Sequence, residues 1–272
     1  MIGDADALDD EAMLRMARET RLSETTFIQS PTADGADYCN RIWTIAGELP
    51  FAGHPSLGTA VAVARSRGER SARYVQQTQA GLQPVGVELD EDGRHASAWM
   101  LQEPAVFGAE VDKAKAMAAA GLFPEDAHPS LPPQVVSTGV AHVIAPVVGS
   151  SALARAEPDQ VALGALLERL GAVVLYLVAL DPDRERAHAR SFTPSVAGGE
   201  DPATGSAAGP LACHVARHGR IAFGDEIEIS QGAEIKRPSK LYARVEGSPE
   251  QISKVEVGGS AVIVARGEFK LD

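Results

Sequence analysis

Two short segments of the sequence share a pattern of residues that could hold charge and move protons. They read GHPSLGTA over Gly53–Ala60 and GEDPATGSAA over Gly199–Ala208. In both, an acid–base residue precedes proline, two variable residues, glycine, a hydroxyl residue and alanine, so that His54 matches Asp201. Histidine titrates near neutrality, and aspartate can orient an amine, a hydroxyl or the histidine itself. The two segments therefore predict acid–base chemistry. The alternative for Asp201 is an ordinary helix N-cap, and for His54 a capping or buried structural histidine.

Each segment leads into a helical pattern, predicted over Thr59–Arg67 and Ser206–His218. A proline near the first helical position is preorganised for the helix, because the N–H that it lacks would have no intrahelical partner. Small residues in the first turn leave backbone N–H groups open to a ligand, and the helix dipole favours negative charge there. Ordinary turn glycines are the alternative reading. The predicted substrate-binding residues are Gly53, Thr204, Gly205 and Ser206.

Glu24 is the candidate proton shuttle. It lies between Ser23 and Thr25, where a predicted helix ends and a strand begins, and a strand end can direct a carboxylate into a cleft. A partly desolvated carboxylate there could remove a proton and then return it. The internal repeat matches Glu24 to Val173, which indicates that the shared fold does not need the acid. The alternative is a solvated glutamate at a loop edge.

The repeat extends beyond the two segments. A predicted helix over Asp9–Thr20 and a strand over Thr25–Gln29 match a helix over Asp159–Leu170 and a strand over Ala172–Ala179, at an offset of about 149 residues. This alignment pairs Leu14 with Leu163, Glu19 with Glu168 and Phe27 with Tyr176. Short alternating strands follow each central helix. We therefore predict an α+β fold of two similar lobes, 1–127 and 134–272, joined by a proline-rich linker at 127–133.

The first lobe is expected to lack its first strand and turn. In the second lobe, the turn Ser137–Gly139 and a strand-like segment over Ala141–Val148 precede the first matched helix, whereas Met1–Leu8 stands in that place in the first lobe. A missing strand would leave an exposed sheet edge. The alternative is that the two lobes simply differ.

The composition excludes several classes of protein. The net charge of −12 and the pI near 5.1 disfavour a nucleic-acid partner, which would need a basic face. No run reaches transmembrane length, and the acidic start does not resemble a signal peptide. The two cysteines, Cys39 and Cys213, have no metal-ligand spacing and are expected to be buried and apolar in a cytoplasmic protein with reduced thiols.

Five motifs together resemble the phenazine-biosynthesis PhzF-like family, in the right order and over nearly the whole chain. They are LSETTF (Leu22–Phe27), FAGHPSLGTA (Phe51–Ala60), STG (Ser137–Gly139), GEDPATGSA (Gly199–Ala207) and QG followed by RPS (Gln231–Ser239). The resemblance implies the diaminopimelate-epimerase fold, in which each lobe is a curved, mostly antiparallel or mixed sheet wrapped around a central helix. It also implies a homodimer without a cofactor, and an active site between the lobes that contains Glu24, His54 and Asp201. The best understood member isomerises trans-2,3-dihydro-3-hydroxyanthranilate by moving a proton between ring carbons.

The sequence departs from the family pattern in two places. Family members usually begin with a further strand and a Gly-Asn-Pro turn. They also usually have glycine where this chain has Lys236. If that position needs a positive φ, lysine there costs on the order of 1 kcal/mol. Arg237, beside it, could neutralise an acidic substrate, although a structural or solvated charge is the more common role of such a residue.

Three hypotheses of function remain. The favoured one is a cofactor-free isomerase acting on a small anionic amino or hydroxy acid. An epimerase with two catalytic thiols is disfavoured, because neither helix start has a cysteine. A metal-dependent hydrolase and a non-catalytic binding protein with an incomplete first lobe are the other two. The hydrolase would have to use His54, His95, His142, His188 and Asp201, which show no close ligand spacing.

Overall fold

The computed structural model describes residues 1–181, 185–196 and 198–270, and these residues form two compact units. The first unit is Met1–Leu101 with the chain from Gly258 onward, and the second is Gln102–Val257. The bounds of the units differ from those of the predicted lobes. The first unit leaves off at Leu101, 26 residues before the predicted end of the first lobe at 127, and the chain returns to this unit at Gly258. The expected linker belongs to the second unit, where Leu131 is buried and Ala127 pairs with Val147.

The first unit contains two α-helices and a mixed sheet. Its strands are ordered β1-β2-β4-β5-β6, with β2 and β4 parallel, and β3 adds to β2. The elements are α1 (Asp10–Thr20), β1 (Thr25–Gln29), β2 (Tyr38–Trp43), β3 (Glu48–Leu49), α2 (Gly53–Arg67), β4 (Ser71–Thr78), β5 (Gly81–Leu89) and β6 (His95–Gln102).

The second unit repeats this plan on a larger scale. Its strands are ordered β15-β14-β13-β11-β10-β9-β8-β7, with parallel pairs at β9–β10 and β11–β13, and β12 adds to β11. The elements are β7 (Val106–Glu110), α3 (Lys113–Ala119), a 3-10 turn (Pro124–Asp126), β8 (Gln134–Ser137), β9 (Ala141–Val147), α4 (Ser150–Arg155), α5 (Gln160–Leu170), β10 (Val174–Leu180), β11 (Arg186–Phe192), β12 (Glu200–Asp201), α6 (Gly205–Arg217), β13 (Glu226–Gln231), β14 (Ser239–Gly247) and β15 (Ile252–Val262).

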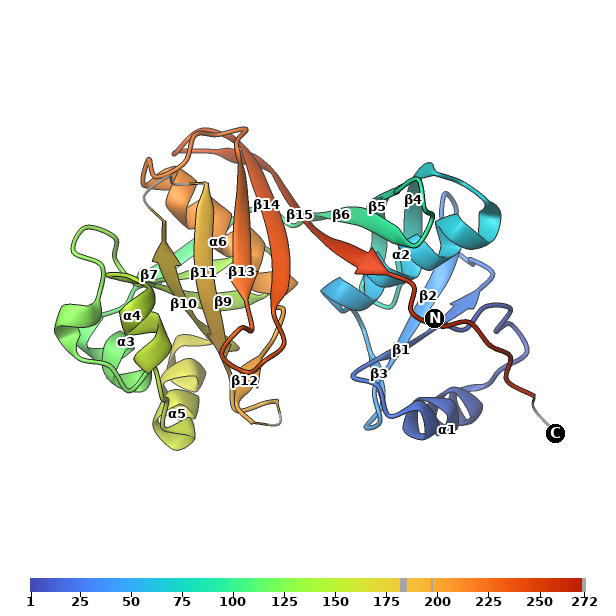
Figure 1. Cartoon of the computed structure of the whole chain (residues 1–272), viewed down its shortest axis with the longest axis horizontal. Helices are drawn as coiled ribbons and strands as arrows, with labels where there is room; N and C mark the ends of the chain where they lie inside the picture. The colour runs from blue at the N-terminus through green and yellow to red at the C-terminus, as the bar shows by residue number, and fades with distance from the viewer. Residues whose placement is uncertain (182–184, 197, 271–272) are drawn as a thin grey trace. The chain divides into compact units, whose positions relative to one another are not determined.

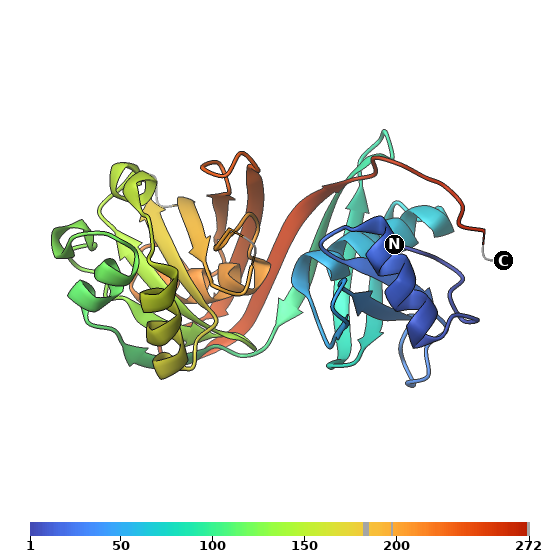
Figure 2. The ribbon, with the colours of Figure 1, turned by 90° about the horizontal axis from the view of Figure 1, so that it is seen from below.

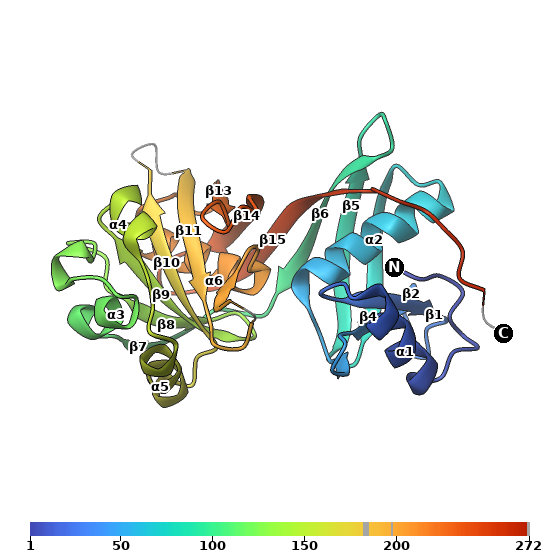
Figure 3. The same cartoon turned by 60° about the horizontal axis from the view of Figure 1, so that its bottom comes forward.

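A central helix packs on one face of each sheet, and other helices pack on the opposite face (Figures 1, 2 and 3). In the second unit, strands β8 to β15 contribute to a core around α6, whereas α3, α4 and α5 cover the other side of β9 and β10. In the first unit, α2 packs on β4, β5 and β6, and α1 packs on Phe27 and Trp43. The residues from Ala207 to Ala216 of α6 are all buried, as expected for a helix that is apolar all round. None of the helices among the described residues combines the length and apolar character that crossing a membrane requires.

The repeat is present, but its predicted register is wrong by one residue at the first helix and strand. Asp9 and Asp159 both cap their helices, which gives an offset of 150 for α1 and α5. Met13 therefore corresponds to Leu163, and both are fully buried. Phe27 faces the core around α1, whereas Tyr176 faces the core around α6, so these two residues do not correspond. A one-residue slip moves a strand residue to the other face of its sheet.

The predicted match between His54 and Asp201 is also wrong. Trp43 pairs with Glu48 as Phe192 pairs with Glu200, so the residue after each glutamate, Leu49 or Asp201, corresponds. The central helices begin at Gly53 and Gly205, an offset of 152 rather than 147. His54 therefore corresponds to Ser206, since each is the second residue of its helix. The similarity of the two sequence segments predicted the wrong pairing, because glycine and proline each occur more than once near both helix starts.

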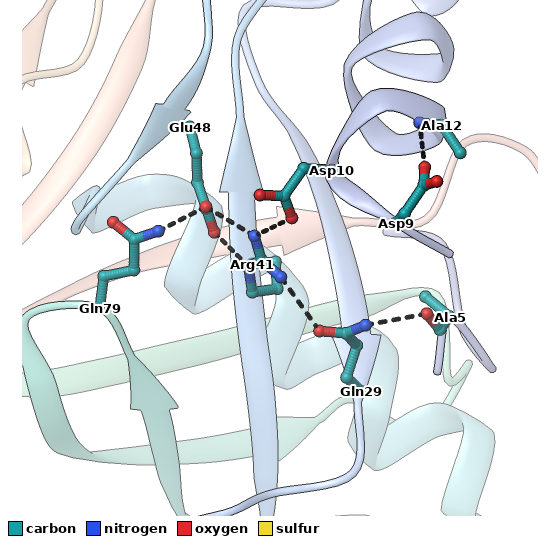
Figure 4. A network of polar contacts seen from close by, with 8 residues as sticks. All are labelled: Ala5, Asp9, Asp10, Ala12, Gln29, Arg41, Glu48 and Gln79. Carbon is teal, nitrogen blue, oxygen red and sulfur yellow. Dashed lines mark hydrogen bonds and ion pairs between the residues drawn. The ribbon is translucent and has the colours of Figure 1, made fainter. Parts of the chain in front are cut away.

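A duplicated arginine–glutamate pair anchors the chain just before each central helix. In the first unit, Arg41 forms a bidentate pair with Glu48, and it also donates to Asp10 at 2.8 Å (Figure 4). In the second unit, Arg190 donates to both oxygens of Glu200 at 3.0 and 2.7 Å. Bidentate pairs of this kind fix geometry as well as charge. They hold β3 and β12, and therefore the turns that follow these strands.

The two units differ where a strand was predicted to be missing. In the second unit, β9 pairs with β10 in parallel over six consecutive positions. In the first unit, the corresponding contact of β1 is a single bridge between Ile2 and Phe27. The segment before α1 is otherwise tied to β1 by a hydrogen bond from the Ala5 N–H to the Ile28 carbonyl, 3.0 Å long.

Candidate active site

The alternation of β1 places Glu24 on the side of α2. The Thr59 hydroxyl of α2 donates to the Thr26 hydroxyl at 2.7 Å, and Ile28 packs on the core around α2. Phe27 points to α1. Because successive strand residues face opposite sides, Glu24 shares the face of Thr26. Its counterpart in the second unit is the buried Val174 rather than the predicted Val173, so an apolar residue there does satisfy the fold.

Glu24 meets His54 in the first turn of α2. The Oε2 atom of Glu24 lies 2.9 Å from Nε2 of His54, and the side chains are 17% and 62% exposed. Oε2 is buried and makes no well-directed hydrogen bond to any residue that the structure describes. A buried carboxylate oxygen without a donor is costly, and a proton or a ligand donor would relieve that cost. The predicted shuttle and the predicted histidine are therefore adjacent.

Both central helices begin without a side-chain cap. Asp9, Asp112 and Asp159 cap α1, α3 and α5 through backbone N–H groups. The N-cap positions of α2 and α6 are Ala52 and Thr204, and neither side chain caps its helix. The first N–H groups of these two helices are thus open to a ligand, which suits an anion. The predicted binding residues Gly53, Gly205 and Ser206 lie at these helix starts and are partly exposed.

Thr204 is buried, and its side chain does not cap α6. Its hydroxyl donates to the Asp201 carboxylate instead of capping α6. Gln231, at the end of β13, donates to the Asp201 carbonyl at 2.7 Å and to the Thr204 hydroxyl at 3.0 Å. Asp201 itself is partly exposed. Thr204 therefore supports Asp201 and the turn before α6.

His142, which the sequence offered only as a ligand of the disfavoured metal-dependent hydrolase, lies near the first turn of α6. His142, on β9, is fully buried with neither ring nitrogen in a well-formed hydrogen bond. Burial lowers the pKa of His142 to about 4, and the nearby Ser206 carbonyl only partly opposes this shift. Pro210 cannot donate to that carbonyl as a helix residue normally would, because proline has no N–H. Pro210 was the signal in the sequence that the Ser206 carbonyl would lack its usual helical hydrogen-bond donor.

The STG motif (Ser137–Gly139) contacts the first turn of α6 through Gln102. Thr138 donates to Oε1 of Gln102 at 2.6 Å, and Nε2 of Gln102 donates to the Gly205 carbonyl at 3.0 Å. Gln102 also passes so close to α6 that a Cβ at Gly209 would lie 1.9 Å from its Oε1. The first turn of α6 is thus held by Gln102 as well as by the contacts of Thr204. Arg237, at the turn after β13, is exposed.

The cysteines lie away from both helix starts. Cys213 is fully buried in α6, as predicted, and burial raises the pKa of its thiol to about 12. Cys39 is partly exposed, which corrects the prediction of a buried residue, and its pKa is also raised by burial. A raised pKa disfavours the thiolate that a catalytic cysteine needs.

The histidines that a metal site would need have other neighbours. His95 lies 2.6 Å from Asp92, and His188 lies 3.4 Å from Asp181. Within residues 1–181, 185–196 and 198–270, no three or more histidine, cysteine, aspartate or glutamate side chains are grouped so that they could hold a metal ion.

The chain is similar to known proteins over nearly its whole length. The family model described as phenazine biosynthesis-like protein (PhzC-PhzF) matches residues 1–267. A trans-2,3-dihydro-3-hydroxyanthranilate isomerase of Pseudomonas aeruginosa is 40% identical over 268 residues, covering 98% of this chain and 91% of the relative. The crystal structure of a PhzF-family phenazine biosynthesis protein from Bacillus anthracis has a TM-score of 0.81 and 28% identity, covering 96% of this chain and 89% of that one.

A more distant structure extends the likeness of fold. A probable proline racemase from Agrobacterium radiobacter has a TM-score of 0.64 at 12% identity, covering 97% of this chain and 82% of that one. The α+β architecture with one central helix in each unit is the diaminopimelate-epimerase-like fold of these enzymes. With a family match over nearly the whole chain, this protein belongs to the phenazine biosynthesis-like PhzF family and is an isomerase.

Proposed function

We propose that this protein moves a proton between two carbons of a small anionic amino or hydroxy acid, with Glu24 as the acid–base group and without a cofactor. The observation that carries the proposal is the position of Glu24. Its Oε2 is buried, makes no hydrogen bond within the part of the chain that the structure describes, and lies 2.9 Å from Nε2 of His54. A carboxylate in this condition can accept a proton from carbon and return it.

The reaction needs three parts. Glu24 removes a proton from one carbon, and the electron pair left behind spreads into an adjoining unsaturated or carboxyl group. Uncapped N–H groups at Gly53, Gly205 and Ser206 would stabilise the negative charge that develops on oxygen. Glu24 then returns the proton to a second carbon, which restores the starting state of the enzyme. His54 would hydrogen-bond to the substrate or adjust the protonation of Glu24, and Asp201 would accept a hydrogen bond from a substrate amine or hydroxyl.

The family supplies the first substrate to test. The Pseudomonas aeruginosa relative is named for trans-2,3-dihydro-3-hydroxyanthranilate, which carries a carboxylate, an amine and a hydroxyl group. We propose this compound, or a cyclic amino or hydroxy acid like it, as the substrate. The Asp201 carboxylate and the N–H groups at the helix starts match its donor and acceptor groups.

The test is turnover in deuterated water. The protein, dialysed against a chelator, is incubated with trans-2,3-dihydro-3-hydroxyanthranilate and then with a panel of cyclic amino and hydroxy acids. Chromatography and mass spectrometry report the isomer formed and any deuterium at carbon. Isomerisation without added metal or cofactor supports the proposal. Tight binding of these compounds without isomerisation or exchange would favour a binding protein, and activity that requires a metal would overturn the proposed mechanism.

A further inference from the structure

We propose that Gln231 is a positioning residue that sets the direction of the Thr204 hydroxyl and, through it, the Asp201 carboxylate. This inference rests on the proposed function, in which Asp201 accepts a hydrogen bond from the substrate. All the residues involved lie in the second unit, where Tyr176 on β10 and Gln231 on β13 reach the turn before α6.

The orientation of the Gln231 amide follows from its neighbours. The Thr204 backbone N–H can only donate, and it lies 3.2 Å from Oε1 of Gln231. The Tyr176 hydroxyl donates to the same oxygen at 2.9 Å, and burial raises the pKa of Tyr176, which keeps its proton in place. Two donors on one side of the amide identify that atom as the oxygen. Nε2 therefore faces the Asp201 carbonyl and the Thr204 hydroxyl, at 2.7 and 3.0 Å.

The donors and acceptors around the Thr204 hydroxyl also determine where its proton points. A hydroxyl has one proton to donate. The Thr204 oxygen already accepts a hydrogen bond from Nε2 of Gln231, which has only donors. The hydroxyl proton is thus directed to its other partner, Oδ2 of Asp201. This explains why Thr204, at the N-cap position of α6, leaves its helix uncapped.

Asp201 is consequently held with one oxygen occupied and one available. Oδ2 accepts from Thr204, whereas Oδ1 has no hydrogen bond to any of the described residues. An ionised carboxylate has about four acceptor sites on its two oxygens, so Oδ1 can still accept a hydrogen bond. The network therefore selects a substrate with an amine or hydroxyl donor that faces Oδ1, and it fixes where that donor must lie.

Three substitutions separate positioning from general stability. Thr204→Val keeps the shape but removes the hydroxyl, and Thr204→Ser keeps the hydroxyl but removes the methyl group. Gln231→Glu keeps the acceptor facing Tyr176 and replaces the donor facing Thr204 by an acceptor. We expect Thr204→Val and Gln231→Glu to lower kcat/KM by about tenfold or more, in line with a lost hydrogen bond to a charged group. Thr204→Ser should remain within about threefold of the wild type.

Tyr176→Phe is the matched control, because the Thr204 N–H still fixes the Gln231 oxygen. We expect it to lower thermal stability while kcat/KM stays within about threefold. Equal loss in Thr204→Ser and Thr204→Val, or wild-type activity in Thr204→Val, would overturn the inference. So would a loss in Tyr176→Phe as large as that in Gln231→Glu.

Crystal structures provide a readout that does not depend on activity. In Thr204→Val, the Asp201 carboxylate should rotate away from its wild-type position, and in Thr204→Ser it should not. An unmoved Asp201 in Thr204→Val would overturn the network even if the wild type proves active. Conversely, a wild type that isomerises nothing would contradict the proposed function alone, since the rotation can still be observed. If Thr204→Val does not fold, Gln231→Glu and Thr204→Ser give the same comparison.

Discussion

Oε2 of Glu24 and Nε2 of His54 lie 2.9 Å apart, one just before β1 and the other in the first turn of α2. Two features of the chain bring them together. The alternation of β1 directs Glu24 to the side of α2, and the Arg41–Glu48 pair anchors the segment that leads to His54. The second unit has Val174 and Ser206 at the corresponding positions. The second unit therefore folds without a glutamate or a histidine at the positions of the proposed acid–base pair.

His54→Ala tests whether this histidine takes part in the reaction. We expect kcat/KM to fall by about a hundredfold or more, because positioned acid–base groups contribute factors of this size. Stability should change by no more than about 0.5 kcal/mol, since the side chain is 62% exposed. His95→Ala is the control, because His95 is also exposed and contacts a carboxylate. Equal activity of the two variants would remove His54 from the mechanism.

Lys236 has a φ of 59°, so this position does have the positive φ that favours glycine. A lysine in this left-handed region carries strain that glycine does not. We expect Lys236→Gly to raise the free energy of unfolding by up to about 1 kcal/mol, measured by denaturant titration. Lys115→Gly, in helix α3, should have the opposite sign. A destabilised Lys236→Gly would show that the side chain contributes more than its strain costs.

Gly209 and Gly164 form a matched pair of helix glycines with opposite surroundings. A Cβ at Gly209 would lie 1.9 Å from Oε1 of Gln102, and relief of that clash would break the hydrogen bonds of Gln102. We expect Gly209→Ala to destabilise the protein by about 1–3 kcal/mol. The nearest atom to a Cβ at Gly164 is Cγ of Pro194 at 3.5 Å, an ordinary contact. Gly164→Ala should therefore stabilise by about 0.5–1 kcal/mol. Thermal or denaturant unfolding of both variants checks the signs.

Two buried histidines make the free energy of unfolding depend on pH in the acidic range. Burial lowers the pKa of His142 and His214 to about 4, from an ordinary 6.5. Between these values the unfolded chain binds protons that the folded protein does not, so stability is lost as the pH falls from about 6.5 to about 4. Each histidine contributes roughly 3 kcal/mol to that loss.

His142→Leu isolates one of the two. The slope of unfolding free energy against pH should decrease by at most about 1.4 kcal/mol per pH unit between pH 4 and 6.5. Between pH 7 and 8 the slopes of variant and wild type should coincide, because the histidine is neutral in both states. A slope that is unchanged at acidic pH would mean that His142 is protonated as readily in the folded protein as in the unfolded chain.

The sequence predicted the elements more reliably than the register between the two halves. The helix predicted over Asp9–Thr20 spans Asp10–Thr20, and the strand predicted at Thr25–Gln29 has the same bounds in the structure. The offset between the halves is 150 at α1 and α5 but 152 at α2 and α6, because the connections differ in length. No single offset therefore aligns both pairs of helices, and the match of His54 to Asp201 used an offset of 147, which neither pair has.

The supporting residues of the site were harder to predict than the acid–base residues. Glu24 and His54 belong to short motifs, and strand alternation indicates that they meet. Tyr176 and Gln231 are 55 residues apart and come together only through the order of strands β10, β11 and β13. That order includes a parallel pairing, which a list of likely strands does not specify. Likewise, the extent of each unit depends on β6 and β15, whose long-range placement has no local signal.

Glu24→Gln tests the central claim most directly, because it keeps the shape of the side chain and removes its ability to take up and return a proton. The measurement is the rate of isomerisation of trans-2,3-dihydro-3-hydroxyanthranilate in deuterated water, followed by mass spectrometry, with Glu19→Gln in helix α1 as the control. We predict that Glu24→Gln lowers kcat by about a thousandfold or more, within the range known for acid–base groups, while Glu19→Gln matches the wild type. A folded Glu24→Gln that isomerises the substrate at the wild-type rate would contradict the account.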